Sequence, residues 1–271
     1  MKGRHVHPES TRGTQFLSSM RIACFALALA PGLSRAALSD EIQVYDDDIN
    51  APHVFGLELH ANTTPEGRSV PDYPGEVVPN HGLRLTPEFS YGLTRAWEAG
   101  LYVPSSFDSA GRGSLAGWKL RLKWLALHPD EGAAGWFAGA NGELSRLQEK
   151  FSASRDAFEL RTIGGYRADA WLLAVNPVFG WDLSPGFRGA PDFSLGVKAT
   201  HDIADKVAVG AEYYSEMGKT THILPLREQA NTLFGVIDLQ VKSFGIDFGI
   251  GRGLTGSADK WTVKAIFAIP L

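Results

Sequence analysis

Hydrophobic and polar residues alternate with a period of two along most of the chain after Val54. The clearest case is the segment 118–124, in which two sets of side chains alternate: Trp118, Leu120, Leu122 and Trp124 with Lys119, Arg121 and Lys123. Successive side chains of a β-strand point to opposite faces, so this segment would carry one apolar and one cationic face. A helix would spread both sets around its circumference. The pattern therefore predicts a strand with two chemically different surfaces.

The same alternation recurs over the whole of residues 54–271. It predicts about twelve strands of roughly eight to eleven residues, a length that suits a tilted strand crossing a bilayer. The segments are 55–61, 83–91, 97–103, 118–124, 136–144, 158–162, 171–181, 193–200, 207–214, 231–240, 244–250 and 261–271. We therefore expect an all-β fold, namely a transmembrane antiparallel up-and-down β-barrel.

The predicted connections alternate between long and short. The long ones are 62–82, 104–114, 145–157, 182–192, 214–230 and 251–260, and the short ones are 92–96, 167–170, 201–206 and 241–243, with 125–135 as an exception. Outer-membrane barrels have short turns on the periplasmic side and longer loops outside. The alternative, a soluble β-sandwich with the apolar faces between two sheets, gives no reason for this asymmetry.

Aromatic residues gather at the ends of the predicted strands. These residues are Tyr91, Trp97, Trp118, Trp124, Trp136, Tyr166, Trp171, Trp181, Tyr213 and Trp261. Trp and Tyr rings prefer the boundary between lipid and water, where they form girdles around membrane proteins. Their placement favours a barrel whose apolar face meets lipid.

The opposite face of the predicted strands carries charges of both signs. We expect the following residues to line a lumen: Glu58, Arg84, Glu88, Glu98, Lys119, Arg121, Lys123, Glu143, Glu159, Arg161, Lys198, Glu212, Asp247 and Lys264. The cationic ladder of Lys119, Arg121 and Lys123 has two interpretations. It could guide an anionic solute, or it could pair with Glu98 and Glu143 on the neighbouring strands and close the lumen.

The last predicted strand places apolar residues at every second position up to the final one. They are Trp261, Val263, Ala265, Phe267, Ile269 and Leu271. This strand resembles the assembly signal of Gram-negative outer-membrane β-barrel proteins, which usually ends in an aromatic residue rather than in leucine. Segments 86–94 and 249–255 also resemble hairpins of porin-like and transporter-like members. The resemblance implies an outer-membrane location, contact with lipids and lipopolysaccharide, and insertion by the barrel-assembly machinery.

Residues 1–36 have the pattern of a cleavable signal peptide. Met20 and Arg21 precede a short apolar run over 22–30, and Pro31 and Gly32 then lead to small residues before a predicted cut after Ala36. Residues 1–19 are polar and without periodicity, so Met20 is a candidate for the true start. The apolar run is too short to span a bilayer permanently. A buried N-terminal helix is the alternative.

Residues 37–53 are expected to form a periplasmic leader before the first strand. The triplet Asp46-Asp47-Asp48, followed by Asn50, could suggest calcium. It lacks the spaced ligands and terminal Glu of a calcium loop, so we interpret it as solvated.

Charge and cysteine content exclude several functions. The formal charge is −4, and removal of residues 1–36, which hold five basic and one acidic side chain, changes it to −8. This balance does not suggest a nucleic-acid-binding protein. Cys24, the single cysteine, lies in the predicted signal peptide, so neither a disulfide framework nor a zinc site of several thiolates is expected.

These patterns predict a passive pore or facilitated-diffusion channel for small solutes, without a cofactor or metal. Loops 62–82 and 214–230 would fold over its mouth. One alternative is a membrane-embedded lipid hydrolase, which needs a histidine and a serine on one wall. No Gly-x-Ser-x-Gly motif is present, and we assign no catalytic role to the candidate histidines, namely His53, His60, His81, His128, His201 and His222. A closed structural or adhesive barrel is the other alternative.

Overall fold

The computed structural model describes residues 41–130, 133–241 and 244–269. The predicted signal peptide and the terminal Leu271 lie outside this part of the chain. No helix in the described ranges is long and apolar enough to cross a membrane.

Twelve long antiparallel strands make up the wall of the barrel in the described part of the chain. They are β1 (Phe55–Glu66), β2 (Leu83–Gly92), β3 (Trp97–Tyr102), β6 (Gly117–Leu127), β7 (Gly135–Leu147), β8 (Asp156–Ala168), β9 (Trp171–Asp182), β10 (Asp192–Ala204), β11 (Val207–Lys219), β13 (Ala230–Val241), β14 (Phe244–Gly253) and β15 (Trp261–Ile269). The expected all-β barrel is confirmed.

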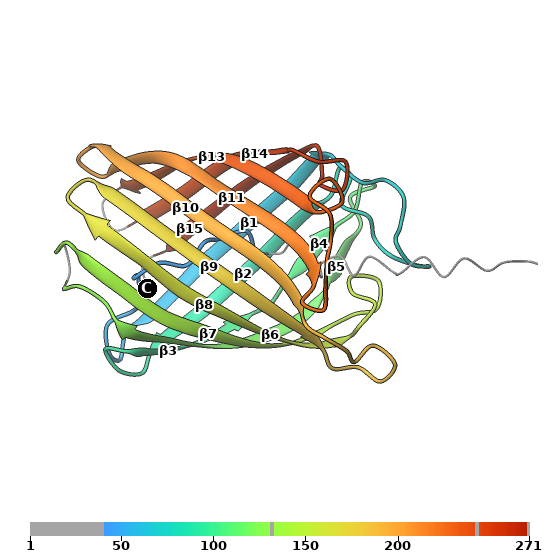
Figure 1. Ribbon diagram of the computed structural model, residues 1–271, viewed down its shortest axis with the longest axis horizontal. Coiled ribbons are helices and arrows are strands. Elements are labelled where there is room, and N and C mark those ends of the chain that lie inside the picture. Colours follow the sequence, from blue (N-terminus) through green and yellow to red (C-terminus); the bar gives the residue numbers. More distant parts are fainter. Residues whose placement is uncertain (1–40, 131–132, 242–243, 270–271) are drawn as a thin grey trace, which may run out of the picture. The chain divides into compact units, whose positions relative to one another are not determined.

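The sheet closes because β1 has a partner on each side. It pairs with β2, with Phe55 opposite Tyr91, and with β15, with Leu57 opposite Ile269. Each remaining long strand pairs with its neighbours along the chain, which gives an up-and-down order (Figure 1). Closure leaves no unpaired edge along the ring of long strands, as the hydrocarbon region of a bilayer requires.

The two ends of the barrel differ in the length of their connections. One end, called here the short-turn end, carries segments 93–96, 128–130, 133–134, 169–170 and 205–206 together with the paired residues Val241 of β13 and Phe244 of β14. The other, the long-loop end, carries 67–82, 103–116, 148–155, 183–191, 220–229 and 254–260. Several strands run further than expected, so the first long loop begins at residue 67 rather than 62.

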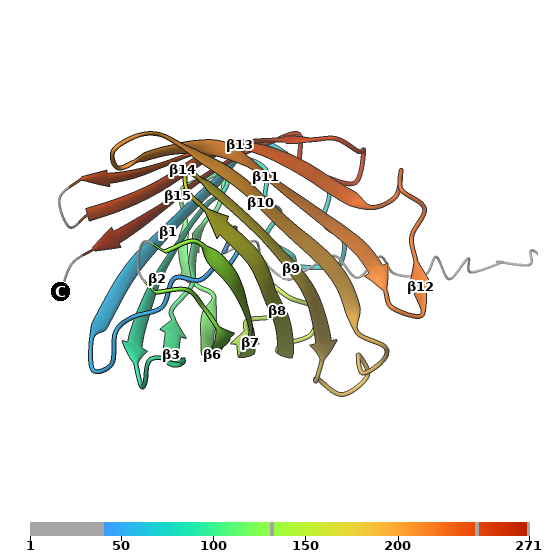
Figure 2. The same ribbon diagram turned by 60° about the vertical axis from the view of Figure 1, so that its left-hand side comes forward.

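Three short strands lie within the long loops. Two of them, β4 (Ser105–Phe107) and β5 (Gly113–Leu115), form a hairpin, and β4 pairs with β2 beyond the end of β3. The third, β12 (His222–Ile223), pairs with the end of β11 (Figure 2). The predicted loop 104–114 therefore continues the sheet locally instead of being irregular.

Apolar side chains cover the outside of the barrel as the alternation predicts. Leu120 is 49% exposed and Leu122 is 44% exposed, whereas Arg121 between them is buried. Aromatic pairs mark both ends of this surface. At the short-turn end Trp97 stacks on Trp124 at 5.7 Å, and at the long-loop end Phe158 lies 5.7 Å from Trp181. This is the arrangement of a lipid-facing band with two aromatic girdles.

Candidate functional site

The inner face of the wall carries the residues singled out from the sequence. Of these, the buried members are Arg84, Glu88, Glu98, Arg121, Lys123, Glu143, Lys198, Glu212 and Lys264, and the partly buried ones are Glu58, Lys119, Glu159, Arg161 and Asp247. Their side chains lie on the face opposite the exposed apolar residues. That these residues line a path for solutes stays a prediction.

The barrel also contains a piece of its own chain. Residues 41–50, called here the N-terminal segment, run inside the ring of strands before the chain turns at 51–54 and enters β1 (Figure 1). Ile42, Val44 and Tyr45 are buried. The expectation of a solvated segment before the first strand is therefore wrong for these residues.

Tyr45 is the main contact of the N-terminal segment. Its hydroxyl lies 2.7 Å from the hydroxyl of Tyr102, and its backbone N–H donates to Asn176 Oδ1 at 2.6 Å. Asn176 in turn donates to the Tyr45 carbonyl oxygen at 2.9 Å. Three cations surround the ring, with Arg161 at 4.5 Å, Lys123 at 5.0 Å and Arg121 at 5.8 Å from its centroid. Cations this close to an aromatic face are attracted by its quadrupole.

Polar contacts continue toward the short-turn end. Asp47 accepts two hydrogen bonds from Arg167, and the Asn50 backbone N–H donates to Glu98 Oε2 at 2.7 Å. The chain passes very close to Gly92, because a Cβ atom there would lie 2.1 Å from the Ala51 carbonyl oxygen. Only glycine leaves room for this approach.

An apolar cluster accompanies these polar contacts and is not anticipated from the sequence. Val44 and Tyr45 pack with wall residues that point inward: Leu125, Phe137, Ile163, Leu172 and Ala174. The inner face is therefore not uniformly polar. Its apolar patch lies where the N-terminal segment provides a matching apolar surface, which stabilises the segment by burial.

The cationic ladder on β6 is paired. Arg121 donates to Glu88 Oε1 and to Glu98 Oε1, each at 2.6 Å. Lys119 lies 3.2 Å from Glu143, and Lys123 donates to the Asp48 carbonyl oxygen. Of the two interpretations left open by the sequence, the contacts of Lys119 and Arg121 fit pairing with the neighbouring strands, whereas Lys123 contacts the N-terminal segment.

A second ion-pair network lies on the wall formed by β10 to β15. Lys264 is fully buried and lies 2.6 Å from Glu212 and 3.2 Å from Asp247. Lys198 approaches the same two carboxylates at 3.6 Å and Asp238 at 3.0 Å. Buried charges need such compensation, since an isolated charge in this environment is strongly unfavourable.

The sequence did not point to a further cluster formed by Glu58, His60 and Glu88. One potential ligand atom of each residue lies within 4.8 Å of the other two. His60 lies two residues after Glu58 and therefore on the same face of β1, and it is fully buried. A Glu-x-His pair on one strand face was visible in the sequence, but the position of Glu88 depends on the β1–β2 register.

The serine–histidine pair of a hydrolase is not formed within residues 41–130, 133–241 and 244–269. The described histidines contact Tyr91, Glu58, Glu88, Asn80 and backbone carbonyl oxygens, and among the residues described no serine is hydrogen-bonded to a histidine. The contacts of these histidines are therefore not those of an imidazole base that activates a serine.

Loop 67–82 connects two regions of the long-loop end. The Arg68 backbone N–H donates to Asp259, and the Val77 backbone N–H donates to the Lys150 carbonyl oxygen, both at 2.8 Å. Within this loop, burial and the neighbouring Glu76 raise the pKa of Tyr73 to about 12. The loop therefore contacts both the β14–β15 and the β7–β8 connections.

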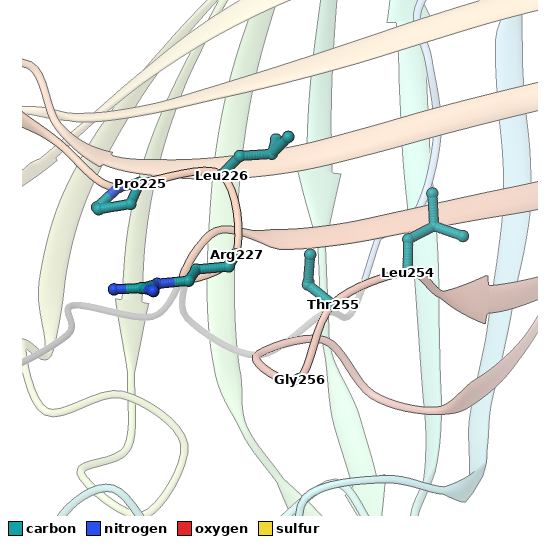
Figure 3. A pocket seen from close by; sticks show the side chains of 6 residues that line it. All are labelled: Pro225, Leu226, Arg227, Leu254, Thr255 and Gly256. Carbon is teal, nitrogen blue, oxygen red and sulfur yellow. The ribbon is translucent and has the colours of Figure 1, made fainter.

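Loop 220–229 rests on the neighbouring loop 254–260. Thr255 Oγ1 donates to the Gln229 carbonyl oxygen at 2.6 Å. Figure 3 shows the shallow pocket between the two loops, lined by Pro225, Leu226, Arg227, Leu254, Thr255 and Gly256. Its open form and small number of polar groups give no indication of a catalytic centre.

Comparisons with known proteins identify the fold. No family model matches the chain, and no curated protein matches its sequence. The crystal structure of an outer membrane channel from Pseudomonas putida F1 is similar, with a TM-score of 0.55 and 10% identity over 84% of this chain and 99% of that one. The NanC porin has a TM-score of 0.50 and 10% identity over 79% of this chain and 100% of its own. The chain thus shares its closed β-barrel fold with an outer-membrane channel and a porin.

Proposed function

We propose that the protein is an outer-membrane channel for passive passage of small polar solutes, with the N-terminal segment as a removable restriction in its lumen. One observation carries the proposal: the ring of strands is wide enough to hold ten residues of extended chain, centred on Tyr45. Small eight-stranded barrels are filled by their own side chains. Space that accepts a peptide also accepts small solutes once the peptide moves.

The inner charges would govern which solutes pass. The proposed lumen residues are the charged side chains of the inner face. On β6, Lys119 and Arg121 pair with carboxylates of other strands, which leaves no strong excess of positive charge there. Rings of charged side chains set selectivity by their local field. We therefore propose weak selectivity between anions and cations, rather than guidance of an anion by Lys119, Arg121 and Lys123 alone.

Targeting is part of the same proposal. Residues 1–36 would act as a signal peptide, and the apolar C-terminal strand would be recognised by the barrel-assembly machinery. Contact with lipids and lipopolysaccharide would follow from the exposed apolar band and its aromatic girdles. A secreted, membrane-inserted product is the predicted result of expression in a Gram-negative host.

Single-channel recording in planar bilayers tests the channel. The chain from residue 37 is compared with a variant lacking residues 41–50, and heat-dependent mobility in gels verifies that both barrels are folded. We expect small, flickering conductance for the first and a larger, steadier conductance for the second. Two folded, inserted proteins without conductance would instead support the closed structural barrel.

A further inference from the structure

Two carboxylates face each other directly across the first pair of strands. Glu58 on β1 is the register partner of Glu88 on β2. Like charges in directly opposed positions destabilise a sheet. His60 lies beside both, with its Nε2 atom 3.1 Å from Glu88 Oε2 and 3.6 Å from Glu58 Oε2. The three side chains therefore converge on one point where positive charge is needed.

The distances from His60 to the two carboxylates fit a metal ion. Zinc–nitrogen and zinc–oxygen bonds of about 2.0–2.2 Å in a tetrahedron separate neighbouring ligand atoms by about 3.3–3.6 Å. The two distances from His60 Nε2 lie close to this range. One imidazole with two carboxylates is a ligand set for zinc and similar divalent transition metals, whereas calcium prefers six to eight oxygen ligands.

Arg121 holds one of the candidate ligands in place. Its Nε atom donates to Glu88 Oε1 at 2.6 Å, which leaves Oε2 directed to His60. Arg121 also pairs with Glu98, so one guanidinium is shared by two carboxylates. Together with Glu58 the group holds three carboxylates and one guanidinium. A divalent cation would neutralise the resulting charge, and a hydrogen-bonded carboxylate is a usual feature of metal ligands.

An unused hydroxyl adds an independent indication. Thr86 is the register partner of His60, so both side chains lie on the same inner face. Thr86 is fully buried, and its Oγ1 atom has no hydrogen-bond partner in the described part of the chain. Buried hydroxyls are normally satisfied. A fourth ligand, either this hydroxyl or a water molecule that it binds, would complete a four-coordinate site.

We propose that Glu58, His60 and Glu88 form a binding site for a divalent transition metal ion, of which zinc is the best-fitting example, on the inner wall of the barrel. The ion would join β1 to β2 close to the point where the ring closes. This site does not depend on whether the barrel conducts solutes.

Metal binding by the folded protein tests the proposal. The chain from residue 37, with an affinity tag that lacks histidine, is folded in detergent, stripped with a chelator and titrated with Zn²⁺ in a calorimeter. We expect one equivalent to bind. Co²⁺ in its place should give the visible absorption bands of a four-coordinate ion, and Ca²⁺ should not compete.

Matched variants identify the ligands. Glu58→Gln and His60→Gln should weaken binding at least about 100-fold, and Thr86→Val by about 10-fold. Glu159→Gln removes another inward carboxylate and His222→Gln removes an exposed imidazole, so both should bind zinc as the parent does. The proposal is overturned if the stripped parent binds no zinc, or if all four Gln variants bind alike. The first of these results would assign His60 a different role, as an imidazolium between the two carboxylates.

Discussion

The hydroxyls of Tyr45 and Tyr102 lie 2.7 Å apart inside the barrel, joining a segment that precedes the first strand to the wall at β3. Tyr102 is fully buried, and Tyr45 is 5% exposed. Their contact occurs together with the three cations around the Tyr45 ring. The docking of the N-terminal segment therefore includes this buried tyrosine pair, in addition to the contact of Asp47 with Arg167.

Tyr45→Ala should release the N-terminal segment. Truncation of a large buried aromatic side chain costs on the order of 3 kcal/mol, and each 1.4 kcal/mol changes an equilibrium tenfold. We expect the ratio of docked to undocked segment to fall roughly a hundredfold. In planar bilayers the variant should remain in its larger conductance state for longer than the parent does.

Tyr45→Phe is the matched control for this change. It keeps the ring and its contacts with Arg161 and Lys123, and it loses the hydroxyl contact with Tyr102. One neutral hydrogen bond contributes about 1 kcal/mol, so the shift should be only about fivefold. Equal conductance of parent, Phe and Ala variants would show that Tyr45 does not control passage.

Arg121→Gln should destabilise the barrel strongly. The side chain is 7% exposed and separates Glu88 from Glu98. Removal of one partner from a buried charge pair costs about 3–5 kcal/mol, because the remaining charge is uncompensated. Urea unfolding in detergent micelles, followed by tryptophan fluorescence, measures the loss.

Arg146→Gln provides the comparison, because Arg146 also pairs with a carboxylate, that of Asp156, but is 55% exposed. Exposed pairs contribute at most about 1 kcal/mol. Similar losses for the two variants would mean that water screens the Arg121 cluster as well.

The wall of the barrel could be predicted because lipid imposes a strict rule on it. Trp118 to Trp124 alternate without exception, since one side of β6 meets an apolar surrounding and the other does not. The same rule assigns His60 and Lys264 to the face opposite the apolar side chains, and both are fully buried. The predicted loop boundaries were less accurate, because β7 and β8 are longer than the predicted segments 136–144 and 158–162. Beyond the lipid-facing band a strand does not need an apolar residue at every second position, so the pattern does not mark its end.

The contents of the barrel could not be predicted in the same way. Asp46-Asp47-Asp48 resembles a solvated segment, but a polar interior can also accept acidic residues, and Asp47 pairs there with Arg167. The cluster of Glu58 and Glu88 depends on strand register, which a period of two does not determine. Both features arise from contacts between segments rather than from any local pattern.

Leu122→Arg tests the lipid-facing band. Leu122 lies near the middle of β6, is 44% exposed and points away from the inner face. Arginine on the lipid face costs about 2–4 kcal/mol near the bilayer midplane. We expect reduced folding into lipid vesicles, measured by heat-dependent mobility in gels.

Leu254→Arg is the control for this change. Leu254 is 56% exposed but lies in the β14–β15 loop. Its substitution should leave folding into vesicles almost unchanged, since a loop at the end of the barrel remains in water. Equal folding yields of the two variants would contradict the placement of β6 in the bilayer.

Arg68→Met should loosen loop 67–82. The Arg68 guanidinium binds both carboxylate oxygens of Glu76, at 2.7 and 2.8 Å, and also the Val70 carbonyl oxygen at 2.8 Å. Loss of this partly buried pair should cost about 1 kcal/mol, which raises the population of the open loop roughly fivefold. Cleavage of the folded protein between residues 69 and 80 by a non-specific protease should accelerate to the same extent.

Arg112→Met is the control: it removes an arginine that is 82% exposed and pairs within its own hairpin, with Asp108. It should leave cleavage of loop 67–82 unchanged, because this ion pair does not involve a residue of that loop.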